Sequence, residues 1–244
     1  MIKIALNGSW LKEEKPYVPI TVEEYEKDIR WFMDKGIRHF HIHFRDANGH
    51  DSLDVREIRP QFEALKRAFP DCLIGIGSPL GEDRTSSLRL EQVSDWGDFR
   101  PDYISVNICE EGRAEFVKLL NEKQVPIEFS IFDMEDARTY VGENYNDIAL
   151  RALIEVPCAE TVEETVRNAG EIYEYLKGSY PETEYVVHGE DSFTWDVISY
   201  ARQNGISWRI GLEDVDRDKE GRPITSNREL YLRAIEIADE TMKG

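Results

Sequence analysis

The sequence predicts a single (β/α)₈ barrel spanning residues 1–244. Its 244 residues, 41% of them hydrophobic, come close to the roughly 250 residues at which such barrels form one core. Short apolar segments of strand length alternate with segments of helical period from end to end, which is the pattern of a parallel α/β fold. Eight segments are expected to be strands: Ile2–Leu6, Ile37–Phe44, Cys72–Gly77, Tyr103–Asn107, Pro126–Ile131, Leu150–Val156, Glu184–His188 and Ile206–Leu212.

Capping residues mark the first and last helices of this pattern. Thr21 and Glu24 have the spacing of a capping box, and Gly36 follows as a left-handed stop, so a helix is expected between them. Ser226 and Glu229 repeat the capping box before a final segment of helical period. The chain is therefore expected to end on the eighth helix.

Composition excludes several classes of function. The formal charge is −19, from 49 acidic and 30 basic residues, without the Lys and Arg clusters that nucleic acids require. No apolar run reaches the roughly 20 residues needed to cross a bilayer, and the first residues lack the features of a secretory signal. The three cysteines are sparse and far apart, which fits a reducing compartment. We expect a cytoplasmic protein that binds neither nucleic acid nor membrane.

The sharpest functional signal is the segment HFHIHFRD at residues 39–46. Strict alternation places three histidines and an arginine on one face of a strand and apolar side chains on the other. The polar face then looks into the barrel, with His41 and His43 nearest the carboxyl end of the strand, where barrel active sites lie. Two such imidazoles can meet one cation at about 2.0–2.1 Å. The spacing predicts a metal site, with ordinary buried histidines as the alternative, and His39 is expected to be a deeper core residue.

A second polar face belongs to the segment SWRIGLED, where alternation sets Arg209 and Glu213 together. The carboxyl ends of barrel strands converge on one mouth, so Glu213 can reach His41 and His43. Two histidines and a glutamate with an open position form a catalytic metal set that is typical of zinc, and another divalent transition metal would also fit. The alternative is that Glu213 only pairs with Arg209 or caps the next loop.

Polar residues near the ends of other strands are expected to line the same mouth. The main candidates are Ser78, Asn107 and Glu110, followed by Glu128, Ser130 and His188. The alternative for each of them is an ordinary loop or surface residue.

The strings HIHFRD and RIGLED, with PITSNREL eight residues after the second, resemble motifs of the β-keto acid cleavage enzymes. The start ALNG and the helix entry VPIT fit as well, and the resemblance covers nearly the whole chain, most strongly residues 1–78 and 204–240. It implies a zinc-containing (β/α)₈ barrel that converts a β-keto acid and acetyl-CoA into acetoacetate and an acyl-CoA thioester. Members of the family are usually multimeric, so a homo-oligomer is expected.

The resemblance also implies roles for single residues. The residues that match metal ligands of the family are His41, His43 and Glu213. Arg209 and Asp214 match an arginine–aspartate pair used in proton transfer, which makes Asp214 the expected general base. Ser78, or Gly77 beside it, matches a serine that helps to hold the keto acid, and Glu110 matches a position that contacts substrate.

Departures from the family pattern leave other functions open. Trp10 stands where an amine-binding member has a glutamate, which indicates a bulkier or less charged substrate. Residues 156–160 and 189–192 lack the glycine-rich and basic residues expected beside CoA, so a metal-dependent lyase, aldolase or hydrolase that does without CoA is the second hypothesis. A non-enzymatic binding barrel is the third, and the pair formed by Arg209 and Asp214 argues against it, because binding alone needs no proton-transfer pair.

Overall fold

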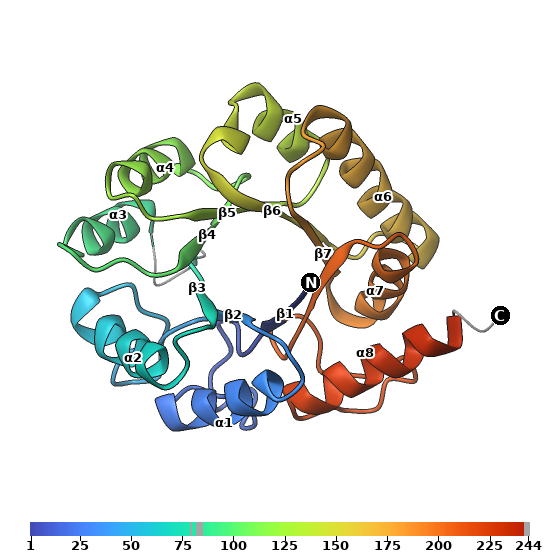
Figure 1. Cartoon of the computed structure of the whole chain (residues 1–244), viewed down its shortest axis with the longest axis horizontal. Coiled ribbons are helices and arrows are strands. Elements are labelled where there is room, and N and C mark those ends of the chain that lie inside the picture. The colour runs from blue at the N-terminus through green and yellow to red at the C-terminus, as the bar shows by residue number, and fades with distance from the viewer. Residues whose placement is uncertain (79, 82–84, 242–244) are drawn as a thin grey trace.

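Eight parallel strands close into a barrel in the computed structural model, which describes residues 1–78, 80–81 and 85–241. The strands follow one another around the barrel in chain order, and helices form the outer ring (Figure 1). The predicted (β/α)₈ barrel is therefore confirmed.

The bounds of the elements follow the predicted alternation. The strands are β1 (Ile2–Ala5), β2 (His39–Ile42), β3 (Leu73–Ile76), β4 (Tyr103–Asn107), β5 (Ile127–Ile131), β6 (Ala149–Val156), β7 (Tyr185–Gly189) and β8 (Ser207–Ile210). The helices are α1 (Val22–Met33), α2 (Val55–Ala68), α3 (Ser86–Ser94), α4 (Arg113–Glu122), α5 (Met134–Gly142), α6 (Val162–Ser179), α7 (Thr194–Gln203) and α8 (Asn227–Thr241), with 3₁₀ turns η1 (Tyr145–Asp147) and η2 (Asp191–Phe193). Among the described residues, no helix has both the length and the apolar character to cross a membrane.

The first predicted capping box is complete, and one of the two hydrogen bonds of the second is present. Glu24 N–H donates to Thr21 Oγ1 at 3.3 Å and the Glu24 carboxylate accepts from Thr21 N–H at 3.2 Å, so α1 begins with a complete capping box. Gly36 adopts φ of +83° beyond the end of α1, as its predicted role requires. At the start of α8, Ser226 Oγ accepts from Glu229 N–H at 3.2 Å.

Strand β2 is shorter than predicted, because a side chain replaces the next rung of its ladder. Asn7 Oδ1 accepts from His43 N–H at 2.9 Å, and Asn7 Nδ2 donates to His43 O at 2.8 Å. This clamp ends the regular strand at Ile42 and fixes the backbone of His43 just beyond it. It places the side chain of His43 at the mouth of the barrel.

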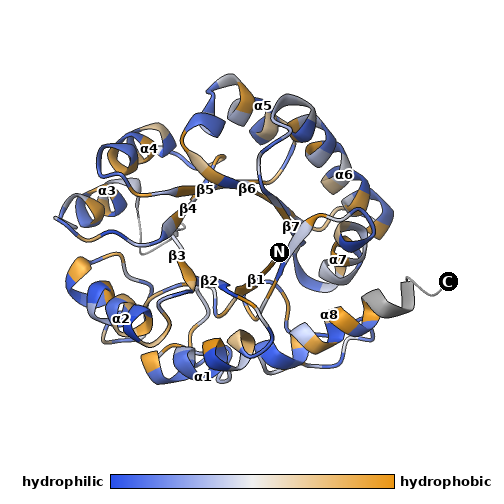
Figure 2. Cartoon of the chain, viewed as in Figure 1, coloured by the Kyte–Doolittle hydropathy of each residue, from blue (hydrophilic) through white to orange (hydrophobic). Residues whose placement is uncertain are grey.

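The outer face of the strands is apolar, while the barrel interior is polar. In Figure 2 the strands carry both orange and blue stretches, and the helices of the ring also carry both colours, as expected of elements with one buried apolar face. Buried aromatic side chains join the two layers, as where the rings of Phe32 in α1 and Phe40 in β2 lie 6.2 Å apart. The apolar core between strands and helices therefore stabilises the barrel. The polar side chains of the interior are not needed for this packing.

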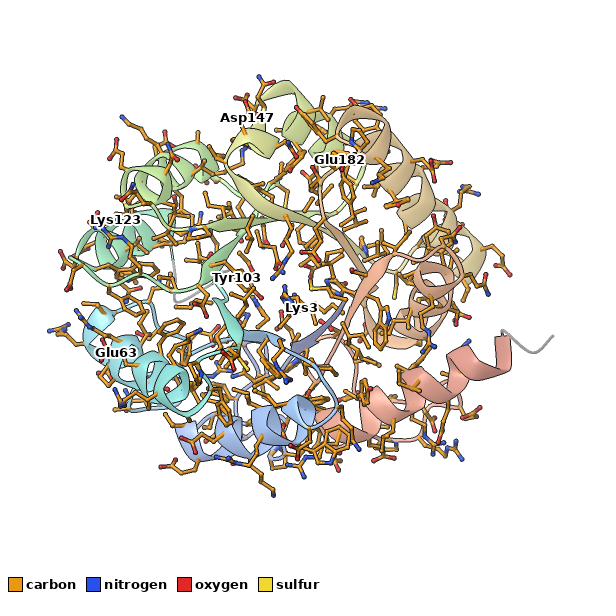
Figure 3. All side chains as sticks on the ribbon, viewed as in Figure 1. Lys3, Glu63, Tyr103, Lys123, Asp147 and Glu182 are labelled. Carbon is orange, nitrogen blue, oxygen red and sulfur yellow. The ribbon has the colours of Figure 1, made fainter. Side chains whose placement is uncertain are left out.

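A buried ion cluster occupies the barrel interior, where Figure 3 labels Lys3, one of its members. Lys3 from β1 and Arg151 from β6 both bind the carboxylate of Glu128 from β5, and all three side chains are buried. Burial lowers the pKa of Lys3 to about 8. The register of β1 places Lys3 beside His39 and the next inward residue, Ala5, beside His41. The cluster therefore lies one layer below the mouth.

Glu128→Gln is expected to destabilise the protein by about 3–5 kcal/mol, because Lys3 and Arg151 would remain as buried charges without their common partner. Urea unfolding measures this change. The control is Glu164→Gln, which removes an exposed partner of Arg167 on α6 and should cost no more than about 1 kcal/mol. Equal losses in the two variants would contradict the prediction.

Candidate active site

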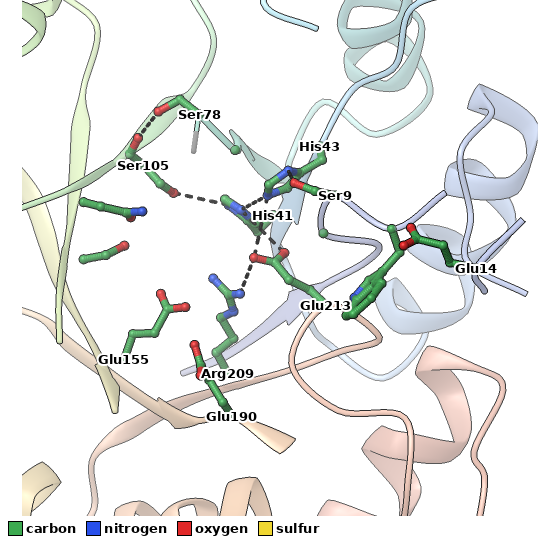
Figure 4. A pocket seen from close by; sticks show the side chains of 15 residues that line it. Ser9, Glu14, His41, His43, Ser78, Ser105, Glu155, Glu190, Arg209 and Glu213 are labelled. Carbon is green, nitrogen blue, oxygen red and sulfur yellow. Dashed lines mark hydrogen bonds and ion pairs between the residues drawn. The ribbon is translucent and has the colours of Figure 1, made fainter. Parts of the chain in front are cut away.

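A cavity of about 430 Å³ opens at the carboxyl ends of the strands, where every strand or the loop after it contributes to the wall (Figure 4). The residues that line it are Gly8, Ser9, Trp10, Glu14, His41, His43, Gly77, Ser78, Ser105, Asn107, Ser130, Glu155, Glu190, Arg209 and Glu213. This is the end of a barrel at which active sites lie.

His41, His43 and Glu213 converge on one point of this cavity. The two Nε2 atoms lie 3.2 Å apart, His41 Nε2 lies 3.6 Å from Glu213 Oε2, and His43 Nε2 lies 3.6 Å from Glu213 Oε1. One potential ligand atom from each residue falls within 4.8 Å of the others, so the three can hold a single metal ion. The structure thus brings together the three residues that the sequence predicts as ligands.

The surroundings shift the pKa values of these three residues in different directions. Burial lowers the pKa of His41 well below its usual value. Burial would also lower the pKa of His43, but the carboxylates of Asp51 and Glu213 raise it to about 9. Burial opposes ionisation of Glu213, yet Arg209 and the histidines hold its pKa well below the usual value. The protonated form of His43 therefore faces a carboxylate at each ring nitrogen, Asp51 at Nδ1 and Glu213 at Nε2.

Neighbouring side chains fix the orientation of both imidazoles. His43 Nδ1 lies 2.8 Å from Asp51 Oδ2, and Asp51 is itself held by Ser9 Oγ at 2.6 Å and by Arg45. His41 Nδ1 lies 3.3 Å from Ser105 Oγ. These contacts leave both Nε2 atoms directed at Glu213, as coordination would require.

Gly77 leaves the space that His43 needs. A Cβ atom at this position would lie 2.1 Å from His43 Nε2, closer than any real contact allows. Any larger residue would push the imidazole away from Glu213.

Arg209 connects the metal candidates to Asp214. Its Nη2 lies 2.5 Å from Glu213 Oε1 and 2.6 Å from Asp214 Oδ1, and Arg209 is almost fully buried. Burial raises the pKa of Asp214 despite the nearby guanidinium, so desolvation outweighs the arginine here. The Asp214 side chain is only 1% exposed and does not line the cavity.

The other predicted residues divide into two groups. Trp10, Ser78, Asn107 and Ser130 line the cavity. Glu110 does not, because its carboxylate binds Arg89, Leu80 N–H and Asn107 Nδ2. His188 and Glu128 are fully buried beneath the wall.

Several residues of the site escaped prediction. Asp51 and Ser9 lie on loops, where alternation gives no direction. Glu155 could have been found, since alternation along β6 sets it on the same face as Arg151. Glu190 follows β7 and lines the cavity beside it.

Comparison with known proteins assigns the family. The family model of the beta-keto acid cleavage enzymes matches residues 1–243. The chain belongs to this family. It is 25% identical to the 3-keto-5-aminohexanoate cleavage enzyme of Acetoanaerobium sticklandii over 244 residues, which cover 94% of this chain and 87% of that enzyme. The enzyme of the same name from Fusobacterium nucleatum is 26% identical, with the same coverage.

A solved structure shows the shared fold. ObcA in a binary complex with oxaloacetate matches with a TM-score of 0.65 and 16% identity. The match covers 93% of this chain and 63% of the ObcA chain. This chain therefore spans less than two thirds of the length of ObcA.

Asp51→Asn is expected to weaken metal binding by about 10–100-fold, because His43 loses the carboxylate that orients its ring. Competition with a chromogenic chelator measures the affinity. Asp46→Asn on the same loop is the matched control, since among the described residues its carboxylate binds only backbone N–H groups of that loop. Unchanged affinity in Asp51→Asn would contradict the assigned role.

Proposed function

We propose that this protein is a zinc-dependent β-keto acid cleavage enzyme that converts a β-keto acid and acetyl-CoA into acetoacetate and an acyl-CoA thioester. The observation that carries the proposal is the convergence of His41, His43 and Glu213 beside Arg209 in the cavity of a chain of this family. A cytoplasmic setting and a homo-oligomer belong to the proposal. The free cysteines support the former, and the family resemblance supports the latter.

The three residues fit zinc on chemical grounds. Two imidazole nitrogens and one carboxylate form a donor set of catalytic zinc sites. Glu213 Oε2 is buried and, within the described residues, has no hydrogen-bond partner, which suits an atom reserved for a metal. A bound zinc would supply Lewis acidity for the negative charge that develops on a carbonyl oxygen during carbon–carbon cleavage.

The residues around the ligands would position the keto acid. Arg209 presents a cation to the cavity. The Nε and Nη2 atoms of its guanidinium both donate to Asp214 Oδ1. This is the pair to which we assign proton transfer. Ser78 and Asn107 offer polar groups on the adjoining wall, where they would bind the substrate, and Trp10 would set the size limit on its other side.

A second candidate function is a metal-dependent lyase, aldolase or hydrolase that acts on another carbonyl substrate without CoA. The observation that favours it is the charge of the wall. Among the described lining residues, Arg209 is the only Lys or Arg, whereas Glu14, Glu155 and Glu190 are acidic. A polyanion such as CoA finds little attraction there.

One assay distinguishes the two candidates. Purified protein with its zinc is mixed with acetyl-CoA and each member of a panel of β-keto acids, and thioester products are measured by mass spectrometry. Formation of a new acyl-CoA supports the proposed function. Consumption of the keto acid at the same rate without acetyl-CoA would favour the second candidate.

His41→Ala and Glu213→Ala are each expected to remove zinc and turnover together, because two ligands alone hold the ion poorly. Elemental analysis of purified variants measures the metal. The exposed His50 provides the control, and His50→Ala should keep about one zinc per chain, as a single three-ligand site predicts. Full zinc content in either ligand variant would refute the ligand assignment.

Asp214→Asn is expected to keep zinc and to lower turnover by about 100-fold or more, the scale of a lost proton-transfer group. The reason is that Arg209 loses the carboxylate that orients it. Elemental analysis and steady-state kinetics on the same preparation measure the two effects. An unchanged kcat would remove Asp214 from the mechanism.

A further inference from the structure

The loop between β1 and α1 brings Trp10 into the wall of the cavity. Figure 4 labels two neighbours of Trp10 in this loop, Ser9 and Glu14. Both lie on one side of Glu213, and Glu155 of β6 lies on the other side. Trp10 therefore bounds the cavity at the end opposite β6.

Arg45, on the loop after β2, fixes the backbone that carries this indole. Its Nη2 donates to Gly8 O and, at 3.1 Å, to Trp10 O, and its side chain is buried. Gly8 in turn lies against a metal candidate, since a Cβ atom at this position would lie 2.8 Å from Glu213 Cγ. The backbone at Trp10 cannot move away from the metal candidates without breaking the contacts of a buried guanidinium.

Lys15 holds the indole itself. Its Nζ lies 3.6 Å from the centroid of the Trp10 ring, which is a close cation–π contact. The same ammonium lies 3.1 Å from Asp216 Oδ2 on the loop after β8. Lys15 does not line the cavity, so it supports the ring from outside.

A tyrosine adds to the hold of Asp216 on the same loop. Tyr17 Oη donates to Asp216 Oδ2 at 3.0 Å. The side chains of Lys15 and Asp216 are only 13% and 27% exposed, so water and salt screen their attraction less than on an open surface. These contacts join the loop after β1 to the loop after β8, which also carries Glu213. We call Lys15 and Asp216 the latch of Trp10.

We propose that Trp10 is the residue that limits the length of the keto acid, and that Lys15 and Asp216 are positioning residues that hold it in place. The inference rests on the proposed function, since its ligand is the keto acid of that reaction. The cavity of about 430 Å³ is near the lower end of the range for ligand pockets. A longer molecule fits only where the indole turns aside, and the latch prevents this movement.

Calorimetry without acetyl-CoA measures the length limit by binding alone. Zinc-loaded protein is titrated with acetoacetate and with the longer acid 3-oxooctanoate, and the ratio of the two dissociation constants gives the preference for length. Trp10→Ala should shift this ratio towards the longer acid by about 10-fold or more, the scale on which a pocket discriminates methylene groups. An unchanged ratio in Trp10→Ala would overturn the inference.

Lys15→Ala should shift the ratio in the same direction by about 3-fold or more, the scale of a lost cation–π contact. Asp216→Ala should act alike, and the double variant should add little, because both residues belong to one latch. A purely structural role would weaken the binding of both acids equally. An unchanged ratio in the two single variants would therefore refute the latch.

Lys12→Ala is the matched control on the same loop, because the Lys12 ammonium pairs with Glu24 of α1 at 2.7 Å. It should leave the ratio unchanged. A shift as large as that of Lys15→Ala would mean that any loosening of the loop has this effect, and would also overturn the latch.

Acyl-CoA formation from acetyl-CoA is measured on the same preparations. If the wild-type protein binds both acids but forms no acyl-CoA, the proposed function fails, and the binding ratios still decide whether Trp10 and its latch limit length. If acyl-CoA forms and the ratios do not move, the failure is confined to the inference.

Discussion

Closure of the barrel through β1 is the constraint on which the site depends. Strand β1 pairs with β2 on one side and with β8 on the other, which brings His41 from near the start of the chain within 3.6 Å of Glu213 from near its end. The closure is tight at Gly211, where a Cβ atom would lie 1.7 Å from Ala5 O. A side chain at that position would separate β8 from β1 and draw Glu213 away from the histidines. The candidate metal site and the closure of the barrel thus rely on the same few backbone contacts.

This arrangement buries several charged side chains in the barrel, and they form ion pairs in two layers. Below, Glu128 pairs with both Lys3 and Arg151, and above, Arg209 is shared by Glu213 and Asp214. A buried charge without a partner would be strongly destabilising, so each layer has to be nearly complete before any ligand arrives. The upper layer leaves Glu213 Oε2 free of hydrogen bonds among the described residues. The site therefore has its buried charges paired and keeps one carboxylate oxygen open for a ligand.

The sequence predicts those parts of the site that depend on strand periodicity. Alternation with a period of two placed His41 and Arg209 in the barrel interior, because the direction of a strand side chain follows from its position alone, and Glu213 reaches the same cavity from the turn after β8. Alternation fails where the backbone leaves the strand. Asp214 turns behind Arg209 and Glu110 turns towards Arg89, since the turn after a strand sets a direction that no period describes. Asp51 reaches His43 across a loop, a tertiary contact that has no local signature.

The charge of the cavity bears on the kind of anion that it can admit. A divalent cation at the histidines would reverse the local sign, since Glu213 alone among the ligands is anionic, and a single carboxylate of a keto acid would then be attracted to that point. The wall opposite presents Glu155 and Glu190, and Cys158 Sγ lies 3.2 Å from Glu190 O, which joins the loops after β6 and β7. A second negative group on that side would be repelled. Under the proposed function, the charges of the cavity therefore favour a keto acid whose anionic end faces the metal candidates and whose other end, facing β6 and β7, is neutral or cationic.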